Sequence, residues 1–279
     1  KVITCHRSFH GRLFGTMVAT AQPKVHQEFA PLLPGFTYVP FNDLDAIRKA
    51  LDPQTIAVML EPIQGEGGVN VPDDDFLPGL RRLCDEHQLL LICDEVWTGC
   101  GRTGKYFAHQ HWNIQPDIMT LAKGVGGGLP VGVMCATPAL AELLDCKKRG
   151  SVAHGTTLGG NCLAMAVAHR IFQVIERDHL LAHATRLGQH VIDRFAAAAR
   201  QNWAIKHVRG KGLFLGIELD LAKLPVPMKL GELVVKCMER GVLVNGTQDC
   251  VLRIAPPINI TQAELDQALD RVEAVLAGQ

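Results

Sequence analysis

No apolar stretch of this sequence approaches the ~18–20 residues that a membrane-spanning helix needs. An excess of charge is also missing, because 28 basic residues balance 28 acidic ones. A chain without net charge gives no electrostatic reason to expect nucleic acid or an anionic membrane as a partner. With 47% hydrophobic and 20% charged residues, the composition indicates a globular protein with a sizeable core, of one or two domains.

Cysteine pairs of the CxxC type are absent as well, although the chain has nine cysteines. Their absence argues against a zinc ribbon or a redox-active pair, and no metal site is expected. An odd number of scattered cysteines, some inside apolar runs such as Cys93 and Cys135, is typical of a reducing compartment. We therefore expect a cytoplasmic protein. Internal repeats and low-complexity linkers are lacking too.

The most informative stretch contains two short apolar runs, Leu89–Cys93 and Ile118–Leu121, with the length and branching of buried strands. Asp94 follows the first run, and Lys123 follows the second just before a run of glycines. Ligands of an open α/β sheet bind outside the carboxyl ends of its strands. We therefore expect this carboxylate and this amine to face one ligand.

Pyridoxal phosphate suits such a pair, because it needs a lysine for a Schiff base and an acid against its ring nitrogen. Asp94 would bind the ring nitrogen, and Val96, two positions on, would point to the same face of the strand and pack on the ring. Glycines would let the backbone come close to the cofactor: Gly124, Gly126, Gly127 and Gly128. The alternative is a buried strand-end aspartate and a surface lysine, which the spacing alone does not exclude.

Five longer motifs, taken together, are more specific than this pair. The segments LICDEVWTGCGRTG, AKGVGGGLPVG, EPIQGEGGV, SFHGR and HGTTLGGN resemble the class III aminotransferases of fold type I, and most of all their acetylornithine group. The resemblance runs from Val2 to about Leu276 with the motifs in the family's order. It implies transamination with pyridoxal 5'-phosphate, here between N2-acetylornithine and 2-oxoglutarate. Ornithine, succinylornithine or 4-aminobutyrate as the donor, or a non-catalytic fragment of the fold, are the alternatives.

The same resemblance implies an α/β fold of fold type I. Its mostly parallel, seven-stranded sheet would lie in a large domain, residues 1–176, followed by a small C-terminal α+β domain, residues 177–279. Members of the family carry a segment before the position of Lys1 that includes a glycine-rich phosphate-binding loop. The sequence is therefore expected to be part of a longer chain. A homodimer with shared active sites is also implied.

Further site residues follow from the resemblance alone. Phe9 would stack on the cofactor ring, and Arg12 would bind a substrate carboxylate, which suits a guanidinium group. Glu66 and Arg253 would pair and control which end of the substrate is held. Thr157 would bind the cofactor phosphate of the neighbouring subunit. The structural alternatives are ordinary loop residues, an ion pair, and a helix cap preceded by a turn.

Four other polar or aromatic positions receive lesser roles. Trp97 stands where the relatives usually have a glutamine that bonds the cofactor, which makes the substrate less certain than the cofactor. Arg102 is expected to form an ion pair or to anchor a loop, and Glu61 to play a supporting part. His10 is interpreted as structural.

Three details of secondary structure are also predicted. Val131–Ala136 is interpreted as another buried strand. The segment Arg209–Gly212 is interpreted as a glycine turn between strands Ile205–Val208 and Leu213–Leu219. A further strand is expected over Val242–Asn245.

Overall fold

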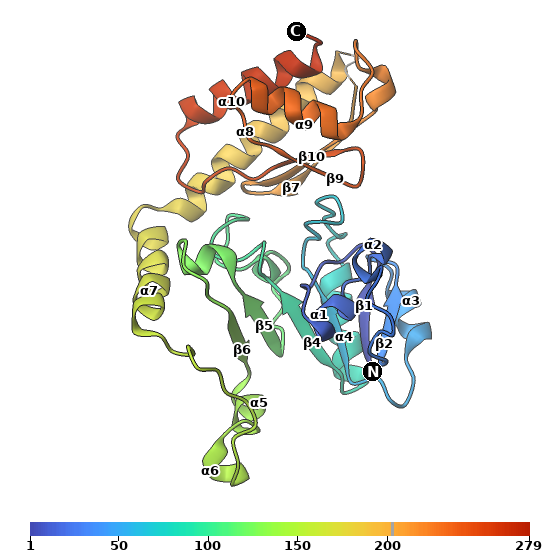
Figure 1. Cartoon of the computed structure of the whole chain (residues 1–279), viewed down its shortest axis with the longest axis vertical. Coiled ribbons are helices and arrows are strands. Elements are labelled where there is room, and N and C mark those ends of the chain that lie inside the picture. Colours follow the sequence, from blue (N-terminus) through green and yellow to red (C-terminus); the bar gives the residue numbers. More distant parts are fainter. Residues whose placement is uncertain (202–203) are drawn as a thin grey trace. The chain divides into compact units, whose positions relative to one another are not determined.

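A computed structural model describes residues 1–201 and 204–279, and these divide into two compact units (Figure 1). The first unit comprises Lys1–Pro62, Pro72–Cys100 and Phe107–Arg177. The second comprises Ile63–Val71, Gly101–Tyr106 and Asp178–Gln279. Two short loops from the first half of the chain thus belong with the C-terminal unit, which nothing in the sequence indicated.

The first unit is built on a six-stranded sheet with the order β2-β1-β3-β4-β5-β6. Its strands are β1 Val2–Cys5, β2 Phe36–Val39, β3 Ala57–Leu60, β4 Leu90–Asp94, β5 Ile118–Leu121 and β6 Val133–Ala136. The first five strands are parallel, and β6 is antiparallel to β5. The expected α/β fold with a mostly parallel sheet is confirmed, with six strands among the described residues.

Helices connect these strands, as a parallel sheet requires. The connecting helices are α1 Phe14–Ala19, α2 Pro23–His26, α3 Leu44–Ala50 and α4 Phe76–Glu86. After β6 follow α5 Pro138–Glu142, α6 Cys146–Arg149 and α7 Cys162–Arg177. Helix α4 buries its apolar residues Phe76, Leu80 and Leu83 and packs on β4. Helix α7 packs on a 3₁₀ helix, Lys123–Gly126. Among the described residues, no helix has both the length and the apolarity to cross a membrane.

The prediction of a buried strand over Val131–Ala136 is wrong in one respect. The strand exists, but it begins at Val133, and Met134 is 56% exposed. The reason is its place in the sheet, because β6 lies at an edge and pairs only with β5 among the described residues. An apolar run therefore identified the strand but not its exposure.

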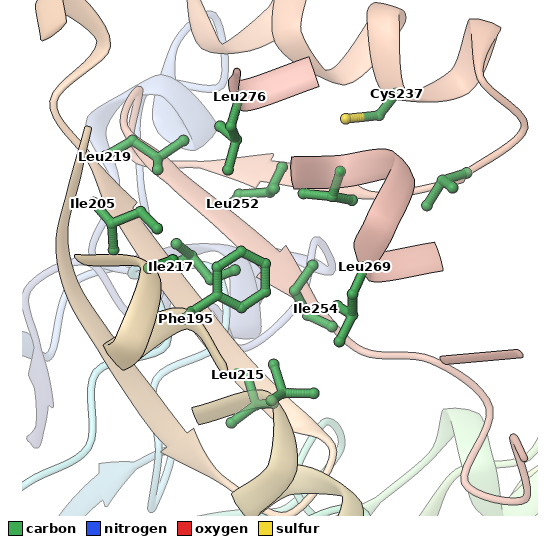
Figure 2. Packing of buried hydrophobic residues seen from close by; sticks show 14 of the residues in the cluster. Phe195, Ile205, Leu215, Ile217, Leu219, Cys237, Leu252, Ile254, Leu269 and Leu276 are labelled. Carbon is green, nitrogen blue, oxygen red and sulfur yellow. The ribbon is translucent and has the colours of Figure 1, made fainter. Parts of the chain in front are cut away.

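The second unit contains a four-stranded antiparallel sheet with the order β7-β8-β10-β9. Its elements are α8 Leu180–Arg200, β7 Ile205–Lys211, β8 Phe214–Leu219, α9 Leu230–Glu239, β9 Asn245–Thr247, β10 Val251–Ile254 and α10 Gln262–Leu276. The helices cover the sheet around a core that includes Phe195, Ile217, Leu252 and Leu269 (Figure 2). An α+β arrangement was expected for this part of the chain.

The turn between β7 and β8 is shorter than predicted. Strand β7 continues through Arg209 and Lys211, and Lys211 pairs with Phe214, so only Gly212 and Leu213 form the loop. Gly212 has a left-handed φ of 54°, and a Cβ atom there would lie 2.4 Å from the carbonyl carbon of Thr103. Gly210, within β7, also needs glycine, because it has a φ of 139° and a Cβ atom there would lie 2.1 Å from the carbonyl oxygen of Phe214. The glycines of the segment therefore did not mark one continuous turn.

The strand expected over Val242–Asn245 is also wrong. Strand β9 begins only at Asn245 and ends at Thr247, where it pairs with Val251 of β10. The apolar residues before it bring the chain back from the end of α9: the backbone N–H of Val242 bonds the carbonyl of Cys237. Their apolar character therefore does not reflect strand pairing.

Candidate active site

The candidate residues of the first unit follow the carboxyl ends of neighbouring parallel strands. Phe9 lies in the loop after β1, and Glu61 follows β3. Asp94 is the last residue of β4, and Lys123 is the second residue after β5. Because these strands are parallel, their carboxyl ends lie at one edge of the sheet, which is where ligands bind in folds of this type.

Asp94 is a buried carboxylate, only 6% exposed. Its Oδ1 atom accepts a hydrogen bond from the backbone N–H of Val96 at 3.1 Å, and its Oδ2 atom lies 2.8 Å from Nδ1 of His10. A carboxylate has about four acceptor positions, so two hydrogen bonds among the described residues leave it able to accept another donor. The site therefore keeps a negative group ready for a ligand proton.

His10 contacts Asp94, a partner that the sequence did not indicate. Its side chain is buried against Asp94, and its backbone N–H donates to Oγ1 of Thr20 at 2.8 Å, which fixes the ring. With a proton on Nδ1 it donates to Asp94 and supports the charge of that carboxylate. Its Nε2 atom is buried and has no hydrogen-bond partner among the described residues. No sequence pattern connects a histidine in one loop to a strand end so far along the chain.

The geometry of Val96 differs from the prediction. Strand β4 ends at Asp94, so strand alternation does not place Val96 on the same face. Instead, the chain turns after Asp94, and Val96 contacts the aspartate through its backbone. Packing of its side chain on a cofactor remains a proposal.

Lys123 begins the 3₁₀ helix after β5 with a left-handed φ of 47°. Such a backbone costs energy for a residue other than glycine, and residues of this kind concentrate at functional sites. Its Nζ atom lies 4.0 Å from the centre of the Trp97 ring. A cation so close to an indole face is held by the ring's quadrupole. Trp97 thus contacts the amine that was predicted to react.

Glu95 is a functional neighbour that the sequence did not reveal. It is 1% exposed and follows Asp94 directly. Its carboxylate accepts hydrogen bonds from the backbone N–H groups of Ala108 and His109, at 2.9 and 2.8 Å, from the His109 ring at 3.0 Å, and from the Thr98 hydroxyl. It therefore ties the turn after Asp94 to the 3₁₀ helix Ala108–Trp112.

Phe9 and Arg12 lie together in the loop after β1. The Cζ atom of Arg12 is 6.0 Å from the centre of the Phe9 ring, and the Arg12 side chain forms no ion pair with another described residue. Glu61 fixes the loop, because its Oε2 atom accepts the backbone N–H of Phe9 at 3.0 Å. Burial, and to a smaller extent the charge of Glu61, raises the pKa of the Cys5 thiol to about 12, so this neighbouring cysteine is not a nucleophile.

Thr157 lies in an exposed turn just before α7. The helix-capping role considered as its structural alternative falls to Asn161, whose side-chain oxygen accepts the backbone N–H of Ala164 at 3.0 Å. A pocket of about 360 Å³ is lined by this turn, by the segment after the glycine run and by the start of α7. Its lining includes neither Asp94 nor Lys123.

Glu66 and Arg253 meet within the second unit. The Nη1 atom of Arg253 lies 2.9 Å from Oε1 of Glu66, and the arginine side chain is 6% exposed while the glutamate side chain is 34% exposed. Arg102 is the loop anchor that was expected, because it donates hydrogen bonds to the carbonyls of Leu213, at 3.2 Å, and Pro256.

Comparison with known proteins places this geometry in a family. The profile of the class-III aminotransferase family matches residues 1–276, so the chain belongs to that family. Among curated relatives, the acetylornithine aminotransferase of Caldanaerobacter subterraneus is 42% identical over 277 residues, 99% of this chain and 67% of that protein. An acetylornithine aminotransferase of Bordetella bronchiseptica is 45% identical over 268 residues, 95% of this chain and 65% of that protein.

Solved structures agree with this membership. The ornithine aminotransferase of Toxoplasma gondii superimposes with a TM-score of 0.92 at 33% identity, over 100% of this chain and 64% of that one. A transaminase of the marine bacterium Virgibacillus gives a TM-score of 0.91 at 28% identity, over 100% of this chain and 68% of that one. The chain thus spans about two thirds of the length of its relatives.

Enzymes of this family use pyridoxal phosphate, and the Toxoplasma structure is described with this cofactor at its active site. The residues of this chain fit the group. Asp94 offers a buried carboxylate with free acceptor capacity for the ring nitrogen. One oxygen of this carboxylate contacts the ring of His10. Lys123 offers a primary amine after the neighbouring strand. The chemistry of this donor set is therefore the one the cofactor needs.

Proposed function

We propose that the protein transfers the terminal amino group of N2-acetylornithine to 2-oxoglutarate, giving N-acetylglutamate 5-semialdehyde and glutamate, a step of arginine biosynthesis. The observation that carries the proposal is the pair Asp94 and Lys123 at the ends of adjacent strands in a chain 40–45% identical to acetylornithine aminotransferases. Ornithine is the second candidate donor, because the Toxoplasma ornithine aminotransferase superimposes over the whole chain.

Three side chains would perform the chemical step. Bound pyridoxal phosphate supplies an electron sink that stabilises negative charge on the substrate carbon. The Nζ atom of Lys123 would hold the cofactor and, once released, would take the proton from the amine-bearing substrate carbon and deliver it to the cofactor carbon. Asp94 keeps a proton on the ring nitrogen, and His10 orients Asp94 by donating from Nδ1. Loss of either Asp94 or His10 would leave the other side chain buried without its partner.

Other side chains, most of them charged, would hold the substrate. Arg12 binds a substrate carboxylate, while Phe9 stacks on the cofactor ring. Glu66 pairs with Arg253 when the donor is bound and moves away when a dicarboxylate acceptor needs the guanidinium. One site can then serve two substrates of different charge, because specificity becomes a difference between two side-chain states.

The proposal includes a homodimer. Thr157 would contact the cofactor phosphate of the neighbouring subunit, which agrees with its exposed position in a hydroxyl- and glycine-rich turn. Val96 would pack on the cofactor ring.

The test uses the intact protein with pyridoxal phosphate. We expect borohydride reduction followed by peptide mapping to place the cofactor on Lys123, and the Lys123→Ala variant to lose transamination. Acetylornithine should react with a higher kcat/KM than ornithine or 4-aminobutyrate. Label on Lys105 or Lys147 would contradict the assignment of Lys123, and a preference for ornithine would replace the proposed donor by the second candidate.

A further inference from the structure

Three residues lie in one row across the sheet of the second unit. Gly216 of β8 pairs with Arg209 of β7 on one side and with Arg253 of β10 on the other. Directly paired residues of an antiparallel sheet point to the same face. Two arginines therefore flank a position that carries no side chain.

The loop that carries Glu66 lies over this gap. A Cβ atom added to Gly216 would be 2.9 Å from Cβ of Val69, closer than two side chains can approach. The glycine therefore allows the loop to lie directly on the sheet between the two arginines. Glu66 of this loop contacts Arg253, as described above.

Arg209 holds the backbone of the loop rather than a carboxylate on it. Its Nε atom donates to the carbonyls of Gly68 and Val69, both at 3.1 Å, and its Nη2 atom donates to Gly68 at 2.8 Å. Its charge is balanced by Glu218, 2.6 Å from Nη1. Because the Arg209 guanidinium already has these hydrogen bonds and this ion pair, pairing with Glu66 instead would break them without a net gain.

Gln248 holds the loop from another side. Its Nε2 atom donates to the backbone carbonyl of Glu66 at 2.9 Å. Gln248 and Asp249 lie in the turn between β9 and β10 with left-handed φ values of 52° and 60°. Two such residues in succession cost conformational energy, and that cost persists only where surrounding contacts hold the backbone in place.

The loop is also closed within itself. The backbones of Gln64 and Asn70 bond each other in both directions at 3.0 Å, and the N–H groups of Gly68 and Val69 bond the carbonyl of Gly65. The backbone of Glu66 is thus fixed from several directions, while its side chain remains one third exposed.

We propose that Arg209, Gly216 and Gln248 form a seat that fixes the backbone of residues 65–70, so that Glu66 changes partner by rotation of its side chain alone. These three are positioning residues for the discrimination between donor and acceptor. This inference rests on the proposed exchange of Glu66 between two states. Without the seat, the whole loop would move and Arg253 would lose its selective partner.

Gln248→Gly separates the seat from overall stability. The change relieves the left-handed backbone and removes the amide, so Tm should stay level or rise while the loop loosens. We expect amide hydrogen exchange at Gly68 and Val69 in the intact protein to accelerate about fivefold to tenfold, the loss of one hydrogen bond. Asp249→Gly is the matched control in the same turn, and it should leave this exchange unchanged. Equal exchange in the two variants would overturn the proposal.

A second measurement connects the seat to specificity. The ratio of half-reaction rates, terminal amine of acetylornithine against α-amine of glutamate, should fall severalfold in Gln248→Gly and Arg209→Ala. Arg209→Lys should recover part of the ratio by restoring charge without the fork. Glu66→Ala should lower the ratio further. If Glu66→Ala leaves it unchanged, the proposed exchange is wrong; if only the seat variants leave it unchanged, the seat is wrong and the exchange stands.

Discussion

Trp97 was interpreted from the sequence as a departure from the family that the chain resembles, and the structure gives it a definite contact. Its ring lies 4.0 Å from the amine of Lys123. Lys123 is exposed, and a cation over an indole face gains about 0.5–1 kcal/mol at an exposed site. The ring therefore stabilises the charged amine in the state in which Lys123 is free of the cofactor.

This contact predicts the reactivity of Lys123 in the cofactor-free protein. In Trp97→Leu, the amine should lose the ring's support and be acylated roughly twofold to fivefold faster by a limiting amine reagent, since about 1.4 kcal/mol is a factor of ten. Trp97→Phe keeps an aromatic face and should react nearly as the wild type does. The exposed Lys105 serves as an internal reference, measured by mass spectrometry. Unchanged acylation in Trp97→Leu would show that the ring does not hold the amine.

At the same scale, the sequence predicted residues whose position follows from a strand end. Asp94 and Lys123 are of this kind, because a branched apolar run followed by a charged residue indicates both the strand and its carboxyl end. His10 and Glu95 could not be assigned in this way. Their partners come from loops and from a 3₁₀ helix, and those contacts depend on packing that local sequence does not encode.

At the scale of elements, the strands β4 and β5 were predicted closely, and errors concentrate where exposure or a turn decides the outcome. Helices α9 and α10 have the amphipathic spacing that identifies a helix covering a sheet. The edge position of β6 and the two-residue turn at Gly212 depend on which strand pairs with which. Pairing is a long-range property, so apolar runs and glycines alone gave the wrong boundaries there.

One element-scale prediction concerns Glu95, which binds the 3₁₀ helix Ala108–Trp112 to the end of β4. Its carboxylate accepts hydrogen bonds from four donors: the Thr98 hydroxyl, the backbone N–H groups of Ala108 and His109, and the His109 ring. Glu95→Gln keeps the shape but turns an NH₂ group toward two of the donors, so we expect a loss of about 2–4 kcal/mol in the free energy of unfolding.

Urea unfolding of the intact protein measures this loss. Glu86→Gln, at the exposed end of α4, is the matched control and should change stability by less than about 0.5 kcal/mol. A similar small change in Glu95→Gln would mean that the four hydrogen bonds do not hold the segment in place.

At the scale of the whole molecule, the segment before α7 carries exposed apolar side chains. Val152 and Leu158 are 76% and 75% exposed, and Leu163 at the start of α7 is exposed as well. Apolar side chains exposed in succession are typical of a surface that binds another protein. This supports the proposed homodimer, in which the same turn carries Thr157 to the neighbouring subunit.

Shared active sites predict a specific result when two inactive subunits are combined. Lys123→Ala removes the amine, and Thr157→Val removes the hydroxyl proposed to bind the cofactor phosphate of the other subunit. In a heterodimer of the two variants, one site has neither group, whereas the other has an intact Lys123 and an intact Thr157 from its partner. Purified by two different tags and assayed at limiting pyridoxal phosphate, this heterodimer should show roughly half the wild-type activity. Each variant alone should be nearly inactive under these conditions, and a heterodimer of Lys123→Ala with wild type should also give about half. An inactive double-variant heterodimer would mean that Thr157 serves its own subunit, and failure to isolate any heterodimer would show that the proposed dimer does not form.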